Sequence, residues 1–206
     1  VLVLRFRIPS FIATLGGMWV YRGLLFPITG GKVIPYTGDH KVFIALSKQI
    51  GWFRPSHVWF LGMGLLFSFL LTRTTYGNWS LATGGSRDTA RAMGVPVNRV
   101  KTINFMLCSM MASFTGIIVV ARFNMCTQTF GLLSELEAVA ATVIGGTYLF
   151  GGFGTILGCL LGTCIVGMIR VGLVMAGAPG YWYQTFVGGI LVVAAIVNQK
   201  LRRAQA

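Results

Sequence analysis

The feature that most constrains the fold is a long apolar stretch, residues 138–199, in which Arg170 is the only charged side chain. Soluble domains carry charges at about a quarter of their positions, whereas this chain is 10% charged and 55% hydrophobic. Apolar sequence of this length has to be divided among several membrane elements, each about 20 residues long if it crosses the bilayer fully. We therefore predict an all-α polytopic membrane protein, with residues 1–206 forming a single transmembrane domain.

Glycine, proline and charged residues divide the chain into about six predicted membrane segments. The fourth is too short to cross comfortably, and a Gly-Gly pair interrupts it, so we expect a short or broken helix there. The segments are Phe11–Thr29, Pro55–Thr72, Thr102–Ala121, Ala138–Phe150, Thr155–Ala176 and Gln184–Asn198.

The basic residues between these segments indicate an orientation. If Arg5 and Arg7 lie in the cytoplasm, basic residues favour the inside by about two to one, and the C-terminus is cytoplasmic. The basic loop Lys32–Arg54 falls outside and opposes this bias.

The net charge of +13 lies mainly in the gaps between the apolar segments, as in membrane proteins, so we expect no nucleic acid partner. Because the chain opens with Val directly before a basic segment, we expect an N-terminally truncated piece of a longer multi-pass membrane protein.

A short polar helix is predicted within the loop 84–101, between two apolar segments. Ser86 suits the N-cap and Asp88 the first turn, where its charge opposes the helix dipole. Gly94 can end the helix in a left-handed conformation, and Asp88 and Arg91 have the i, i+3 spacing of an ion pair. So well delimited a helix in a loop indicates that a soluble partner docks there.

Residues 135–154 form a second unusual segment, which is short and contains two Gly-Gly pairs. Broken helices occur in membranes where protein or a water-filled cavity satisfies the freed backbone groups, and they often line transport pathways. The alternative is an ordinary short helix whose glycines allow close packing. The candidates for a pathway or hinge are Gly145, Gly146, Thr147, Gly151 and Gly152.

Three glycines at four-residue spacing, Gly154, Gly158 and Gly162, predict a small-residue ridge that lets two helix backbones approach. We expect packing within the chain, with a dimer interface as the alternative. Two arginines, Arg22 and Arg170, lie inside apolar segments. Both are candidates for a charge on the pathway, beside the alternatives of snorkelling or pairing within the bundle.

The motifs of catalysis are missing from the sequence. The Gly-Lys pair at Gly31-Lys32 has Phe26 where a phosphate-binding loop needs glycine, and Val33 where it needs serine or threonine. The four cysteines and two histidines lack metal-site spacing. We therefore expect no cofactor or metal in this chain, no enzymatic activity, and an energy source on another protein.

Three stretches of the chain resemble one family. Residues 9–16 with Arg22-Gly23, residues 84–95, and residues 137–158 are similar to segments of the permease subunits of bacterial sugar ABC importers, the ribose/xylose class related to branched-chain amino-acid permeases. They occur in order and cover most of the chain. Ser86 replaces the family's usual asparagine, and Arg87 stands where an acid is often found, so the charge pairs of the coupling segment differ here.

The resemblance implies the C-terminal part of a roughly ten-span permease of the bacterial inner membrane, with about four spans missing and the positive-inside orientation retained. It implies a dimer of two identical or closely related permeases, an ABC ATPase that holds ATP and Mg, and a periplasmic sugar-binding protein. The substrate would be a monosaccharide, xylose or another pentose, moved by alternating access. The residues expected to contact the ATPase are Ser86, Arg87, Asp88, Ala90, Arg91, Met93 and Gly94.

Two alternatives stay open. One is an ABC permease for another small solute, such as an amino acid or a nucleoside. The other is an ion-coupled secondary transporter, which should carry a carboxylate inside a span. Here Glu135 and Glu137 lie at the entrance of an apolar segment instead, which disfavours ion coupling.

Overall fold

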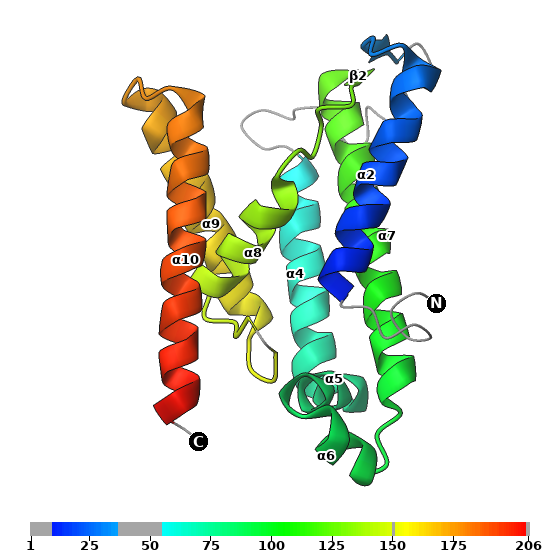
Figure 1. The fold of residues 1–206 in the computed structure, drawn as a ribbon, viewed down its shortest axis with the longest axis vertical. Coiled ribbons are helices and arrows are strands. Elements are labelled where there is room, and N and C mark those ends of the chain that lie inside the picture. The colour runs from blue at the N-terminus through cyan, green and yellow to red at the C-terminus, as the bar shows by residue number, and fades with distance from the viewer. Residues whose placement is uncertain (1–9, 37–54, 150, 205–206) are drawn as a thin grey trace. The chain divides into compact units, whose positions relative to one another are not determined.

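The computed structural model describes residues 10–36, 55–149 and 151–204. These residues form eight helices and one two-stranded ribbon, so the predicted all-α membrane fold is confirmed (Figure 1). The helices are α2 (Ser10–Thr29), α4 (Pro55–Arg73), α5 (Thr75–Gly85), α6 (Arg87–Ala92), α7 (Val97–Phe123), α8 (Ser134–Ile144), α9 (Ile156–Met175) and α10 (Gly180–Ala204).

Three of the described helices, α4, α7 and α9, are long and apolar enough to cross a membrane. They coincide with three of the six predicted segments, and α2 and α10 form at two others. The remaining segment, the fourth, is short, as predicted: α8 has 11 residues and a length of about 16 Å, about half of the hydrocarbon core. Arg5, Arg7 and most of the basic loop Lys32–Arg54 lie outside the described residues.

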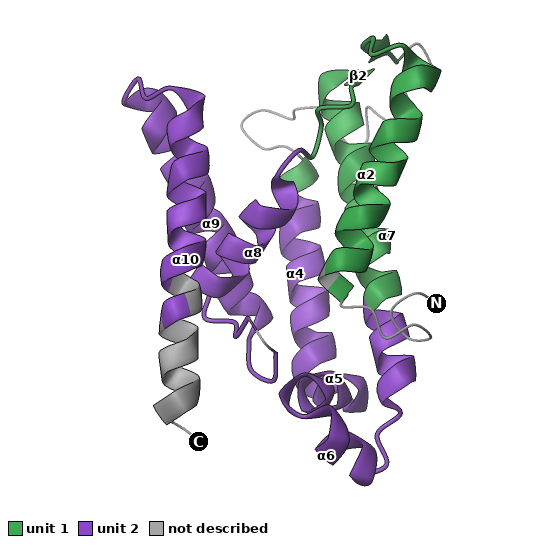
Figure 2. Cartoon of the chain, in the orientation of Figure 1, with its two compact units in different colours: residues 1–57, 105–131 green, residues 58–104, 132–206 purple. Residues whose placement is uncertain are grey.

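The chain divides into two compact units, which are coloured separately in Figure 2. Unit 1 comprises residues 1–57 and 105–131, and unit 2 comprises residues 58–104 and 132–206. Helix α7 contributes its first turns to unit 2 and the rest to unit 1.

Within unit 1, a short antiparallel ribbon joins the segments that follow α2 and α7. Strand β1 (Ile34–Pro35) pairs with β2 (Met125–Cys126), with Ile34 opposite Cys126. The amide of Tyr36 extends the pairing by donating to the carbonyl of Asn124 at 3.0 Å. Neither strand was predicted, because two residues are too few to show an alternation of apolar and polar side chains.

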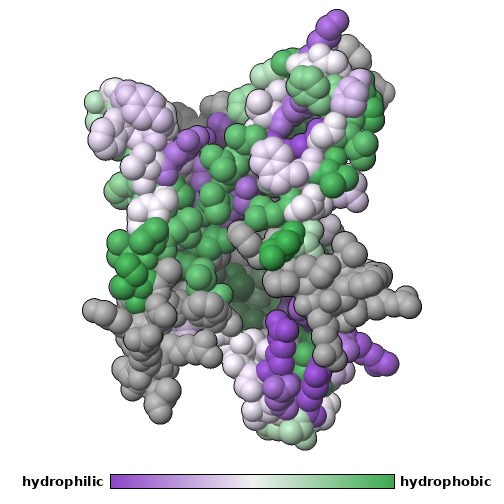
Figure 3. All heavy atoms as spheres, viewed as in Figure 1, coloured by the Kyte–Doolittle hydropathy of each residue, from purple (hydrophilic) through white to green (hydrophobic). Residues whose placement is uncertain are grey.

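Within unit 2, α8 packs against α9 and α10, and α5 packs against α6. Figure 3 shows polar side chains gathered at the end of unit 2 that holds α6. The exposed residues at that end include the arginines Arg87, Arg91 and Arg99. The exposed faces of α4 and α9 carry large apolar side chains such as Leu65 and Met168. Such faces suit lipid or further helices rather than water.

Helix α5 was not predicted, and it begins only one residue after α4. Thr74 is extended, and its hydroxyl accepts a hydrogen bond from the amide of Gly77 at 3.2 Å, which caps α5. The same hydroxyl donates to the carbonyl of Leu70 in α4 at 2.6 Å. A Cβ at Gly77 would overlap the Leu71 carbonyl oxygen, so this sharp corner requires glycine.

Candidate functional site

The predicted helix caps of α6 are both present. Ser86 has extended dihedral angles, and its hydroxyl accepts from the amide of Thr89 at 3.4 Å. The amide of Ser86 donates to the carbonyl of Ala82 at 3.1 Å, so the same residue also ends α5. Ser86 is therefore the only residue between α5 and α6, and a displacement of α6 acts on α5 through a single residue.

The C-terminal end of α6 is closed by Gly94, whose φ of +80° is left-handed. Its amide donates to Arg91 at 2.9 Å, and the amide of Val95 donates to Ala90 at 3.0 Å. This pair of bonds is a Schellman motif, which satisfies the last carbonyls of the helix. The position predicted for the end of the helix is thus confirmed.

Two details of the predicted coupling segment need correction. Ala90, expected to contact a partner, is only 2% exposed and packs inside the chain, whereas Met93 is 77% exposed. Among the described residues the one ion pair joins Arg170 to Glu137, so the predicted Asp88–Arg91 pair is not formed. The side chains of Asp88 and Arg91 are both exposed, and an exposed ion pair contributes little to the stability of a helix. We define the α6 surface by the exposed residues that remain of the predicted contact set, which are Ser86, Arg87, Asp88, Arg91, Met93 and Gly94.

A polar network ties α5 to the first half of α7. The hydroxyl of Tyr76 donates to the side-chain oxygen of Asn104 at 2.5 Å, and the side-chain nitrogen of Asn104 donates to the hydroxyl of Ser80 at 3.0 Å. Burial raises the pKa of the Tyr76 hydroxyl, which favours its protonated, donating form. The network therefore fixes the helix next to the α6 surface.

Helices α8 and α9 touch through their backbones. A Cβ at Gly158 would overlap the carbonyl oxygen of Gly145, and a Cβ at Gly162 would overlap that of Ala141. The glycine ridge thus packs within the chain, as predicted, with Gly158 and Gly162 on α9 and Gly154 just before it. No larger residue at either α9 position can be accommodated without separating the helices.

The predicted hinge residues form the end of α8 and the loop that follows it. Gly146 is left-handed at +82° and closes α8 with a second Schellman motif, in which the amide of Thr147 donates to Thr142 at 3.0 Å. Gly151 and Gly152 are also left-handed, at +86° and +89°. The loop between α8 and α9 is therefore built from conformations that favour glycine.

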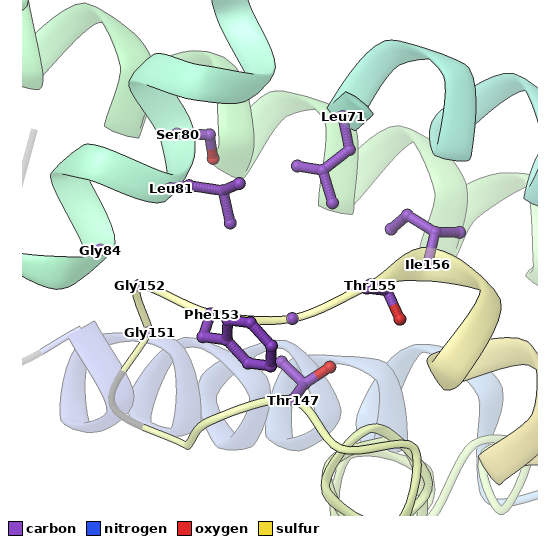
Figure 4. Close-up of a pocket in the computed structure, with 11 residues that line it drawn as sticks. Leu71, Ser80, Leu81, Gly84, Thr147, Gly151, Gly152, Phe153, Thr155 and Ile156 are labelled. Atoms are coloured by element: carbon purple, nitrogen blue, oxygen red, sulfur yellow. The ribbon is translucent and has the colours of Figure 1, made fainter. Parts of the chain in front are cut away.

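A pocket of about 200 Å³ lies between this loop and helices α4 and α5, all within unit 2 (Figure 4). It brings together three of the predicted pathway residues, Thr147, Gly151 and Gly152, but neither Gly145 nor Gly146. Its other lining residues are Leu71, Ser80, Leu81, Gly84, Phe153, Gly154, Thr155 and Ile156. The sequence could not reveal this pocket, because α5 was not predicted.

Both arginines of the apolar segments have partners within the chain. Arg170 on α9 lies 3.6 Å from the carboxylate of Glu137 on α8, and its guanidinium lies 5.2 Å from the centre of the Tyr183 ring on α10. Arg22 on α2 donates to the carbonyl of Gln128 at 3.3 Å. These contacts favour the alternative of pairing within the bundle, and the pathway role of either arginine stays a prediction.

Several known proteins are similar to this chain. The model of the family described as branched-chain amino acid transport system / permease component matches residues 1–195. The ribose import permease protein RbsC of Escherichia coli strain K12 is 36% identical over 97% of this chain and 63% of its own length. The autoinducer 2 import system permease protein LsrC of Klebsiella pneumoniae is 35% identical over 100% of this chain and 59% of its own length. LsrC of Photorhabdus luminescens is 33% identical over 98% of this chain and 61% of its own length.

The chain spans about 60% of the length of these curated relatives. No solved structure matches it.

Proposed function

The chain belongs to the branched-chain amino acid transport system permease family, and from this premise we propose that it is the transmembrane permease subunit of an ABC importer for a monosaccharide. Its relatives include a ribose import permease and autoinducer 2 import permeases, which supports a small solute moving inward. Ribose is the first substrate to test, and no relative named here favours xylose.

The observation that carries the proposal is the α6 surface. A six-residue helix, capped at both ends, presents Arg87, Arg91 and Met93 outward between two apolar stretches. A short exposed helix with fixed ends can be pushed as a unit, because its capped ends resist fraying. This is the property that a contact with a moving soluble subunit requires.

In the proposed cycle an ABC ATPase with bound ATP and Mg docks on the α6 surface. A binding protein outside the membrane delivers the sugar to a dimer of permease subunits. The ATPase drives alternating access only if it binds the two permease conformations with different affinities, since a ligand shifts a conformational equilibrium by its differential binding. Thr147, Gly151 and Gly152 would line or hinge the moving part of the pathway.

The test uses the full-length protein, purified with a candidate ABC ATPase and a candidate binding protein from the same organism and reconstituted into liposomes. ATP hydrolysis and ribose uptake are measured with empty and with ribose-loaded binding protein. We expect the ATPase to co-purify, and loaded binding protein to stimulate hydrolysis about fivefold or more.

Three results would contradict the proposal. Absence of both co-purification and stimulation would reject an ABC permease. Uptake driven by an ion gradient without ATP would indicate the secondary-transporter alternative. Stimulation by an amino acid or a nucleoside, but not by ribose or another monosaccharide, would keep the ABC permease and reject the sugar.

A further inference from the structure

Four glycines bring the end of α5 against the loop between α8 and α9. Gly84 and Gly85 lie at the end of α5, and Gly151 and Gly152 lie in the loop (Figure 4). A Cβ at Gly84 would lie 2.7 Å from the backbone nitrogen of Gly152, and a Cβ at Gly152 would lie 2.8 Å from the Cα of Gly85. We call this the glycine contact; at these two positions it leaves no space for a side chain.

The loop side of the glycine contact has a defined shape. The amide of Gly151 donates to the carbonyl of Tyr148 at 3.0 Å. The amide of Tyr148 donates to the carbonyl of Phe153 at 3.0 Å. The rings of Tyr148 and Phe153 lie 5.4 Å apart across the same turn. With Gly151 and Gly152 both left-handed, these bonds hold the turn as one piece.

The helix side is fixed as well, and it leads directly to α6. Ser86, the residue after Gly85, is bonded to Ala82 of α5 and caps α6. Tyr76 and Ser80 anchor α5 through Asn104. One residue therefore separates the glycine contact from the α6 surface.

The loop side leads in turn to the packed helices α8 and α9. A Cβ added at Gly154 would lie 2.7 Å from the side chain of Thr147, so these two residues are in close contact. Gly145 lies against the backbone of Gly158. A displacement of the loop therefore acts on the place where α8 and α9 are in backbone contact.

We propose that the glycine contact is the mechanical link through which movement of the α6 surface reaches α8 and α9. The inference rests on the proposed function. Side chains can change rotamer and absorb a displacement, whereas two backbones in van der Waals contact cannot. The neighbouring pocket of about 200 Å³ leaves the side chains of α5 and the loop partly apart, so the glycine contact is the tightest part of this junction.

The first test compares two adjacent variants in the complete importer, Gly84→Ala and Gly85→Ala. The added Cβ of Gly84→Ala forces α5 and the loop apart, whereas at Gly85 the nearest atom, the Cα of Gly152, is 3.7 Å away, an ordinary contact. Both variants make the same chemical change at the end of the same helix, so Gly85→Ala is a matched control.

We expect Gly84→Ala to keep the ATPase bound and its basal hydrolysis within about twofold of wild type, while ribose uptake per ATP falls about fivefold or more. Gly85→Ala should stay within about twofold in all three measurements. Equal uptake per ATP in the two variants would overturn the link. Failure of the wild-type protein to bind or stimulate an ATPase would instead reject the proposed function.

A second measurement does not depend on the folding of Gly84→Ala. Spin labels are placed at Ala92→Cys, an exposed α6 position outside the α6 surface, and at Leu157→Cys on α9, after replacement of the four native cysteines. If the link is rigid, the distance between the labels changes by no more than about 1 Å between the nucleotide-free and ATP-bound importer. A change of several ångströms, in an importer that still transports, would overturn the proposal.

Discussion

The α8–α9 pair and the α6 segment solve opposite structural problems. Glycines bring α8 and α9 into backbone contact, with no side chain between Gly158 and the Gly145 carbonyl. By contrast, α6 is held by its two capped ends and one buried side chain, Ala90, and presents most of its residues outward. The α8–α9 pair is therefore suited to keep a fixed spacing between two helices, and α6 is suited to contact another protein.

Glycine therefore has two distinct structural roles in this chain. In α9 it removes a side chain so that two helices can approach, which depends on a partner far away in the sequence. At Gly94 it supplies a left-handed dihedral angle, which depends only on local backbone geometry. Substitutions separate the two tasks by the size and the location of their effects.

The largest effect is expected from Gly162→Ala. Its Cβ would overlap the Ala141 carbonyl, so α8 and α9 must separate, at a cost of about 3 kcal/mol or more in unfolding free energy. Thermal unfolding of the purified protein in detergent measures the loss.

Gly167→Ala is the matched control on the same helix, because nothing lies within 4 Å of its added Cβ. Alanine favours a helix over glycine, so this variant should be unchanged or stabilised by up to about 1 kcal/mol. If both variants melt alike, the close approach of α8 and α9 is wrong.

A smaller and local effect is expected from Gly94→Ala. Alanine at a φ of +80° costs about 1 to 2 kcal/mol, and it loosens the end of α6 without touching α8 or α9. Hydrogen exchange should therefore be faster for the α6 amides by about tenfold, with α9 unchanged. Unaltered protection of α6 would show that packing, and not the cap, holds this helix.

The smallest effect is expected from Glu137→Gln, which removes the one ion pair found among the described residues. Because Arg170 lies five residues before the end of α9, its long side chain can reach the water at the membrane surface, and the pair should contribute no more than about 0.5 kcal/mol. The melting temperature should stay within about 2 °C of wild type. A much larger drop would mean that this charge pair, as well as the glycines, holds α8, α9 and α10 together.

The sequence predicted the elements whose signals are local. Long apolar runs revealed the spans, and Ser86 and Gly94 revealed both ends of α6 through the backbone geometry that each favours. The four-residue glycine spacing revealed a packing face, since Gly158 and Gly162 fall on one side of a helix.

What the sequence did not reveal depends on residues that are distant along the chain. Helix α5 has weak amphipathicity and begins with a threonine cap directly after α4, so it read as a loop. The contact of Gly84 with Gly152 joins two Gly-Gly pairs that share no periodicity. The Asp88–Arg91 pair was wrong because correct spacing on an exposed helix does not outweigh solvation of both charges.

The proposed docking of the ATPase on the α6 surface can be tested with two charge-reversal variants. Arg91→Glu is compared with Arg122→Glu, an equal charge change at the far end of α7, about 40 Å along the helix from Val97. Co-purification of the ATPase with each variant is quantified after membrane insertion has been verified. We predict that Arg91→Glu lowers the amount of bound ATPase about tenfold or more while Arg122→Glu leaves it unchanged. Equal ATPase binding by Arg91→Glu and wild type would reject the α6 surface as the docking site.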